Sequence, residues 1–179
     1  NSGGRASFAN AARTRREGAE LALQSTLNQQ FDLALAYTYL DATVREAYLT
    51  CASVPCTTPQ TEVARGNRLP GVAQGQWYAR LGYAPVADWR LATEVRGLDA
   101  VAVNDSNTEF APSYAVVDLE AAYQRHLNAK QDIKLSLRVE NVLDEAYAGS
   151  VIVNDSNGRY YESARGRTLL AGLQFSLRR

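Results

Sequence analysis

The amino-acid sequence predicts an all-β protein, built as an antiparallel up-and-down meander of about seven strands. Two observations lead to this prediction. Apolar and polar residues alternate with a period of two in seven segments, whereas a helical period is almost absent from the 179 residues. The connections between the segments alternate between short and long, which is the arrangement of a meander with two unlike rims.

The first four segments are justified by the same alternation. Residues 19–27 place leucines at odd positions and Glu, Gln and Thr at even ones. Residues 31–39 continue with Phe, Leu and Tyr at odd positions. The next two segments, residues 77–83 and 89–96, each begin with a tryptophan and carry arginine on the opposite face. Each segment is therefore expected to be a strand with one apolar face.

Three further segments complete the pattern. Residues 115–124, 133–140 and 168–177 alternate Val, Leu, Ile, Ala and Phe with charged or small polar residues. An eighth strand can be drawn only weakly from residues 4–16, where Phe8 and Ala12 alternate with small residues. Without it, we expect an open sheet whose edges are completed by chain outside these 179 residues.

The connections distinguish the two ends of the predicted sheet. The short ones are Asn28–Gln30, Pro85–Asp88 and His126–Asp132, and the long ones are Glu46–Val72, Asn104–Ser113 and Ala148–Arg165. Short turns at one rim and long loops at the other are typical of outer-membrane barrels. The meander is therefore predicted to be part of a transmembrane β-barrel.

The two faces of the strands favour contact with lipid on one side. Several segments are longer than an ordinary globular strand and suit a tilted membrane strand. Aromatic residues recur at both ends of the apolar face, as in interfacial girdles. They are Phe31, Tyr83, Trp89, Tyr123 and Phe175 near the short turns, and Tyr39 and Trp77 near the long loops. A soluble β-sandwich binding module would show the same alternation and remains the alternative.

Composition and motifs exclude several classes of function. Nineteen Lys and Arg balance nineteen Asp and Glu, so the basic excess of a nucleic-acid binder is missing. No catalytic triad, Cys/His dyad or phosphate-binding loop can be assembled, so we expect no enzyme, no catalytic residue and no cofactor. The single histidine, His126, lies far from both cysteines, so no metal site is expected, and His126 is interpreted as a surface residue in a short turn.

The two cysteines are separated by four residues. A short-loop disulfide between Cys51 and Cys56 in an oxidising compartment is the favoured interpretation, with two free thiols as the alternative. Closing so small a ring is expected to pin a loop, with a stabilisation at the low end of the ~2–4 kcal/mol usual for disulfides.

Six short motifs occur in a fixed order along nearly the whole chain. They are EGAEL at 17–21, AYTYLDA at 36–42, GNRLPGV at 66–72, Tyr114 with VDL at 117–119, VENVLDEAY at 139–147 and GRT at 166–168. Each motif alone is weak, but together in this order they are specific. The chain resembles the C-terminal part of the β-barrel of TonB-dependent outer-membrane receptors.

The resemblance implies a location and a set of partners. It implies the outer membrane of a Gram-negative bacterium, with outer-membrane lipid around the barrel and the remainder of the receptor, plug and other strands, completing it. The plug and its TonB box precede the barrel in this family and are absent from residues 1–179. We therefore expect a fragment that contacts the TonB complex only through the missing plug, with a naturally truncated protein as the alternative.

The resemblance also implies uptake of a scarce nutrient, most directly a ferric siderophore or similar metal chelate. A receptor for a small acidic cofactor such as pyrroloquinoline quinone is one alternative. A self-contained small structural or adhesive outer-membrane barrel is another. Under the main interpretation this chain supplies barrel wall, lumen lining and loop contacts to a small-molecule or metal-chelate ligand.

The candidate ligand contacts lie in the last long loop. Arg159, Tyr160, Tyr161 and Arg165 supply planar donors and stacking faces that suit an anionic aromatic ligand, although packing between loops is the simpler role. The sequence Val-x-Val-Asn-Asp-Ser-Asn occurs at 101–107 and again at 151–157. Turn formation is favoured over calcium binding there, because no Glu follows at the calcium-loop spacing. Asn141 and Asp144 are expected to shape the backbone rather than to do chemistry.

Overall fold

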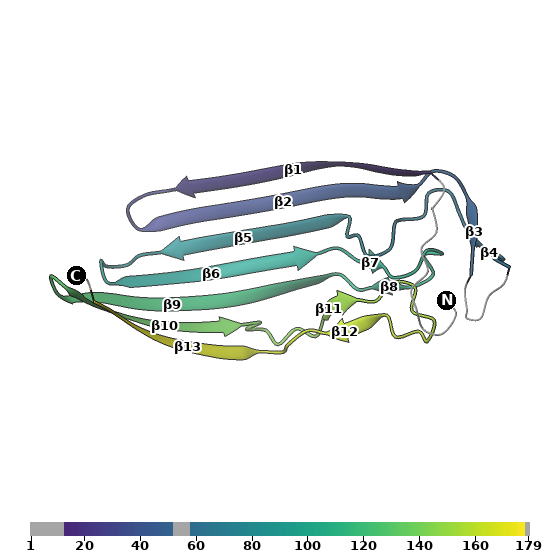
Figure 1. Ribbon diagram of the computed structural model, residues 1–179. Helices are drawn as coiled ribbons and strands as arrows, with labels where there is room; N and C mark the ends of the chain where they lie inside the picture. The colour runs from purple at the N-terminus through teal and green to yellow at the C-terminus, as the bar shows by residue number, and fades with distance from the viewer. Residues whose placement is uncertain (1–12, 52–57, 178–179) are drawn as a thin grey trace.

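The computed structural model describes residues 13–51 and 58–177, and its main element is a seven-stranded antiparallel sheet in the order β1-β2-β5-β6-β9-β10-β13 (Figure 1). The strands are β1 (Thr14–Thr26), β2 (Phe31–Val44), β5 (Gly75–Tyr83), β6 (Trp89–Leu98), β9 (Tyr114–Asn128), β10 (Gln131–Glu140) and β13 (Thr168–Leu177). Each strand pairs with its neighbour along the chain, so the predicted meander is confirmed. No helix long and apolar enough to cross a membrane occurs in the described part of the chain.

Two details at the ends of strands differ from the expectation. Thr14–Arg16 extend β1 instead of contributing to an eighth strand, and residues 1–12 lie outside the described residues. His126 lies within β9 and not in a turn, because the hairpin closes more tightly, with Gln131 directly opposite Asn128. Asn128 closes this turn by accepting a hydrogen bond from the Lys130 amide at 2.9 Å. The His126 side chain is mostly exposed, with Nδ1 against the Asp132 carboxylate.

Each long connection contains a small hairpin that the sequence pattern does not reveal. These hairpins are β3 (Tyr48–Thr50) with β4 (Thr61–Val63), β7 (Val101–Ala102) with β8 (Phe110–Ala111), and β11 (Ala148–Val151) with β12 (Tyr161–Ser163). All of them lie at the same end of the sheet, opposite the short turns (Figure 1). Strands of two to four residues are too short to show a period, which is why the segments are predicted only as loops.

The register places apolar residues against apolar residues on one face of the sheet. Leu23 lies opposite Leu35, and Leu135 lies opposite Leu173. At the short-turn end, the Phe31 and Tyr83 rings stack with centroids 4.6 Å apart, as predicted for an aromatic girdle. Many of these apolar side chains are exposed, Leu21 by 69% and Leu173 by 70%. A continuous apolar face of this size is typical of a barrel wall in lipid.

The sheet is open at both sides. In the described residues β1 pairs only with β2, and β13 pairs only with β10. A small apolar core lies among the loops, where Val101, Val103 and Ala111 are buried and Tyr160 packs against them. Leu98, the last residue of β6, also packs against this core, so the core connects the loops to the end of the sheet.

Candidate functional site

The polar face of the sheet carries a connected set of ion pairs that crosses five strands. We call it the charge ladder, and it consists of Asp32 on β2, Arg80 on β5, Glu94 and Arg96 on β6, Asp118 and Glu120 on β9, and Arg138 and Glu140 on β10. The strand period brings these charges to one face because they occupy even positions. In a barrel this face lines the lumen.

Arg138 lies at the centre of the charge ladder. Its guanidinium is 2.7 Å from Glu94 Oε2 and 2.9 Å from Asp118 Oδ2. It also lies 3.6 Å from Glu120 Oε2 and 3.4 Å from Glu140 Oε1. Glu94 and Asp118 face each other directly in the register, and two like charges in that position repel. Arg138 offsets this repulsion by contacting both carboxylates.

Asp118 is the most buried carboxylate of the charge ladder, with a side chain only 2% exposed. It pairs with Arg96 and Arg138 and accepts a hydrogen bond from the Asn141 amide at 2.8 Å. A carboxylate removed from water needs such partners to remain charged. Asp118 therefore joins the charge ladder to the turn that follows β10.

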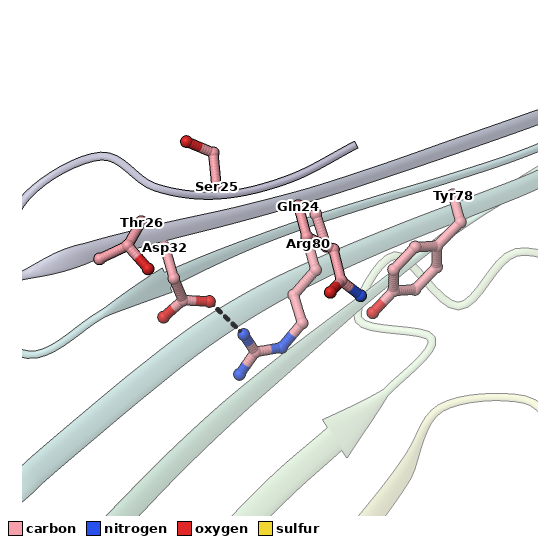
Figure 2. Close-up of a pocket in the computed structure, with 7 residues that line it drawn as sticks. Gln24, Ser25, Thr26, Asp32, Tyr78 and Arg80 are labelled. Atoms are coloured by element: carbon pink, nitrogen blue, oxygen red, sulfur yellow. Dashed lines mark hydrogen bonds and ion pairs between the residues drawn. The ribbon is translucent and has the colours of Figure 1, made fainter. Parts of the chain in front are cut away.

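A pocket of about 470 Å³ lies at the short-turn end of the charge ladder, between β1, β2 and β5. Figure 2 shows the Asp32, Arg80, Gln24 and Tyr78 side chains on the same side of the strands, with Arg80 Nη1 paired to Asp32 Oδ2 at 2.7 Å. The pocket combines fixed charge with amide and hydroxyl groups, which suits contact with water or a polar solute. The described residues contain no group of three or more His, Cys, Asp or Glu side chains able to hold a metal ion.

The loops are braced to one another by the repeated Val-x-Val-Asn-Asp-Ser-Asn segments. Asn154 Oδ1 accepts from the Asp105 amide at 2.9 Å, and Asn154 Nδ2 donates to Asp105 Oδ2 at 2.9 Å. Asn107 exchanges two hydrogen bonds with the backbone of Arg68, at 2.7 and 2.9 Å. Asn107 and Asn154 have φ values of 56° and 57°, a conformation that Asn tolerates better than most residues. The expected turn role of both repeats is confirmed.

Arg68 is a loop residue whose role the sequence did not reveal. Its guanidinium donates to the Ala100 carbonyl at 3.2 Å and to Gln74 Oε1 at 2.6 Å, and it lies 5.9 Å from the centroid of the Phe110 ring. Asn67 Nδ2 donates a hydrogen bond to the Asp105 carbonyl at 2.8 Å. Tyr48 of the first loop hairpin also lies near Asp105, because burial and the Asp105 carboxylate raise the pKa of the Tyr48 hydroxyl above its ordinary value. Contacts to Asp105 therefore connect the first loop with the second, and the loops form one connected layer.

Replacing Asn154 by alanine is expected to loosen this layer. The substitution removes both side-chain bonds to Asp105 and puts a less tolerant residue at a positive φ, a cost of about 1–2 kcal/mol. Hydrogen exchange of the amides in residues 101–112 should become roughly tenfold faster. The matched control is Asn157→Ala in the same loop, whose backbone amide, not its side chain, bonds Asp155. Equal exchange in the two variants would contradict the bracing role.

The predicted ligand residues lie in one segment but do not converge on one point. Tyr160 is half-buried against the loop core, whereas Tyr161 is 46% exposed on β12. Their rings meet edge to face with centroids 6.4 Å apart. The Arg159 amide donates to Asp155 Oδ2 at 2.8 Å, and the side chains of Arg159 and Arg165 are exposed. Cys51 follows β3, and Cys56 lies outside the described residues, so the disulfide stays a prediction.

Asn141 and Asp144 shape the turn between β10 and β11, as expected. Their φ values are 52° and 57°. Asn141 is buried and exchanges hydrogen bonds with the backbone of Glu145, at 2.8 and 2.9 Å. Asp144 Oδ1 accepts from the Arg167 amide at 2.8 Å and so connects this turn to the start of β13.

Comparison with known proteins relates this geometry to one family. Residues 1–142 match the family model described as TonB dependent receptor-like, beta-barrel. The probable TonB-dependent siderophore receptor PiuA of Acinetobacter baumannii is 24% identical over 94% of this chain and 21% of its own length. The metal-pseudopaline receptor CntO of Pseudomonas aeruginosa is 32% identical over 76% of this chain and 18% of its own length. The chain thus spans about a fifth of the length of these relatives.

Solved structures share the fold. The crystal structure of the siderophore receptor PiuA from Acinetobacter baumannii has a TM-score of 0.74 at 23% identity, covering 91% of this chain and 22% of that chain. BauA, the ferric preacinetobactin receptor from Acinetobacter baumannii, has a TM-score of 0.71 at 16% identity, covering 91% of this chain and 22% of that chain. The copper transporter OprC has a TM-score of 0.63 at 17% identity, covering 92% of this chain and 24% of that chain.

Proposed function

Because the chain belongs to the TonB-dependent receptor family, we propose that it forms part of the barrel wall of an outer-membrane transporter that takes up a metal chelate. The observation that carries this proposal is the division of the sheet into two faces. One face is apolar and aromatic, and the other carries the charge ladder across five strands. A wall between lipid and a water-filled lumen needs both faces.

The relatives favour a metal chelate over the other ligands considered. PiuA is named as a siderophore receptor and CntO as a metal-pseudopaline receptor, whereas neither name refers to an acidic cofactor. Exposed arginines and tyrosines in the last long loop suit an anionic chelate with aromatic groups. We therefore assign ligand contact to Arg159, Tyr161 and Arg165, with Tyr160 supporting them from the loop core.

In this proposal the rest of the receptor supplies the other parts of the machinery. The remaining strands would pair with the free edges of β1 and β13 and close the barrel. An N-terminal plug would fill the lumen and connect the receptor to the TonB complex. The chain would then lie in the outer membrane of a Gram-negative bacterium, with the braced loop layer outside.

Uptake of radioactive iron by cells tests the proposal. Cells that express the receptor containing this chain should accumulate iron-55 from at least one ferric siderophore, and receptor-less cells should not. In the receptor, Arg159→Ala combined with Arg165→Ala is expected to weaken chelate binding roughly tenfold or more, because two charged donors are removed.

The matched control is Arg125→Ala on β9, an exposed arginine at the opposite rim. It should leave chelate binding unchanged. Failure of every metal chelate tested, with uptake of a metal-free acid such as pyrroloquinoline quinone, would overturn the metal-chelate assignment. Equal loss of chelate binding in the Arg159/Arg165 double variant and in Arg125→Ala would show that Arg159 and Arg165 do not contact the ligand.

A further inference from the structure

We propose that Asn157 is a site of spontaneous chemical modification, where deamidation through a cyclic imide converts the side-chain amide to a carboxylate. Asn157 lies in the loop between β11 and β12 and is followed by Gly158. It is the last residue of the second Val-x-Val-Asn-Asp-Ser-Asn segment. In the described part of the chain no hydrogen bond involves the Asn157 side chain, so the turn role of the segment leaves this amide unused.

The reaction joins the backbone nitrogen of the following residue to the asparagine side chain. The Gly158 nitrogen loses its proton to a base in the solvent and bonds to Cγ of Asn157. The bond from Cγ to Nδ2 breaks, and ammonia leaves with a proton taken up from the solvent. Water then adds to one of the two carbonyls of the five-membered imide and breaks a ring C–N bond, which leaves aspartate or isoaspartate. The sum consumes water, releases ammonia and oxidises or reduces nothing.

Gly158 leaves room for this attack. Its φ is 72°, and a Cβ added to it would meet nothing within 4 Å. A residue without a Cβ lets its own nitrogen approach a neighbouring side chain with little steric hindrance. The Gly158 amide donates to the Asp155 carbonyl at 3.2 Å, which is longer than the usual distance of about 2.9–3.0 Å. Because Asn157 and Gly158 are both exposed, water can replace this bond.

The first copy of the segment holds the equivalent residue in the opposite way. Asn107 is half-buried, and its side chain bonds the backbone of Arg68 and the Asn104 carbonyl. The nitrogen that would attack Asn107 belongs to Thr108, and this amide donates to Asn104 Oδ1 at 3.0 Å. Both reacting groups are therefore engaged at Asn107, whereas the side chain of Asn157 is not.

The other described asparagines also have hydrogen-bonded side chains. They are Asn28, Asn67, Asn104, Asn128, Asn141 and Asn154. None of them precedes a glycine. A bonded side chain must first break its hydrogen bonds before the ring can close, which slows the reaction. Among residues 13–51 and 58–177, Asn157 alone combines an unbonded side chain with a following glycine.

Deamidation adds a negative charge to this loop. The Asn157 and Arg159 amides both donate to Asp155 Oδ2, at 3.2 and 2.8 Å, so the new carboxylate stands between Asp155 and Arg159 in the chain. An isoaspartate also lengthens the backbone, which shifts Arg159 relative to Asp155. The modified loop is therefore expected to attract an anionic chelate less strongly, a consequence that, unlike the modification itself, rests on the proposed function.

Peptide mapping of the detergent-purified receptor that contains this chain tests the proposal. After prolonged incubation in neutral buffer, the tryptic peptide 139–159 should carry aspartate and isoaspartate at position 157, located by fragmentation mass spectrometry against freshly purified receptor. Asn141 and Asn154 lie in the same peptide and should convert at least roughly tenfold more slowly. Gly158→Ala is expected to slow conversion of Asn157 roughly tenfold, because the added Cβ hinders the attacking nitrogen.

The matched control is Thr108→Gly, which gives Asn107 a following glycine but keeps the hydrogen bonds of its side chain. In this folded variant Asn107 should stay unmodified, whereas in guanidinium chloride Asn107 and Asn157 should convert at similar rates.

Two results would overturn the proposal. One is conversion of Asn141 or Asn154 as fast as that of Asn157 in the folded receptor. The other is equal conversion of Asn107 and Asn157 in folded Thr108→Gly receptor, because the hydrogen bonds would then give no protection. Neither readout depends on what the receptor transports, so failure of this site and failure of the metal-chelate proposal are distinguishable.

Discussion

Replacing Arg138 by glutamine is expected to destabilise the receptor by about 3 kcal/mol, because it leaves several carboxylates without their shared cation. Arg138 lies within 4.0 Å of Glu94, Asp118, Glu120 and Glu140. Glu94 and Asp118 are the most buried of these, with side chains 17% and 2% exposed. Their mutual repulsion is then unopposed except by Arg80 and Arg96.

The effect should be measured by urea unfolding of the full receptor in lipid vesicles. Adding Glu94→Gln to Arg138→Gln is expected to recover part of the stability, because the second substitution removes one of the repelling charges. The stability of Arg138→Lys should lie between that of the unsubstituted receptor and that of Arg138→Gln. A lysine ammonium keeps the positive charge, but it is a point charge and cannot contact several carboxylates in the geometry of a guanidinium.

Arg90→Gln is the matched control on the same face. Arg90 donates to the carbonyls of Ala87 and Trp89, and no ion pair involves it among the described residues. Its replacement should change the free energy of unfolding by less than about 0.5 kcal/mol. A similar loss of stability in the Arg90 and Arg138 variants would show that the charge ladder does not stabilise the wall.

Replacing Leu137 by arginine is expected to cost about 2–4 kcal/mol, because it puts a charge near the middle of the lipid-facing surface. Leu137 lies on β10 between Ala121 on β9 and Ala171 on β13, and its side chain is 46% exposed on the apolar face. The small neighbours leave an arginine no partner there. The guanidinium of an arginine at this depth is far from the headgroup layer, so its charge stays partly in hydrocarbon.

The control uses the same substitution at the end of the same sheet. Leu177 lies opposite Gln131 at the short-turn rim, where Leu177→Arg should cost only about 0–1 kcal/mol. Folding of each receptor variant into vesicles, followed by urea unfolding, gives both values. Equal costs at the two depths would indicate that this face does not lie in lipid.

Most of the wall could be predicted from the sequence because its signal is local. The alternation of Leu and polar residues in β1 and β2 fixes which side chains share a face, whatever the strands pair with. The positions of the short turns could also be predicted. The exception is the turn between β9 and β10, which was predicted to span His126–Asp132 but closes between Asn128 and Gln131. The loop hairpins were missed because strands of two to four residues carry no period.

The contacts of the candidate sites depend on register and therefore on the tertiary structure. Arg138 reaches Glu94 across 44 positions in the chain, and Asp105 meets Asn154 across 49. A sequence pattern assigns each residue to a face but not to a partner, because a partner is fixed only when two distant strands align. The apolar and charged faces were thus determined by the sequence itself. The shared guanidinium of Arg138 and the hydrogen bonds between the loops were decided by the alignment of the strands, since pairing energies act between neighbours in space.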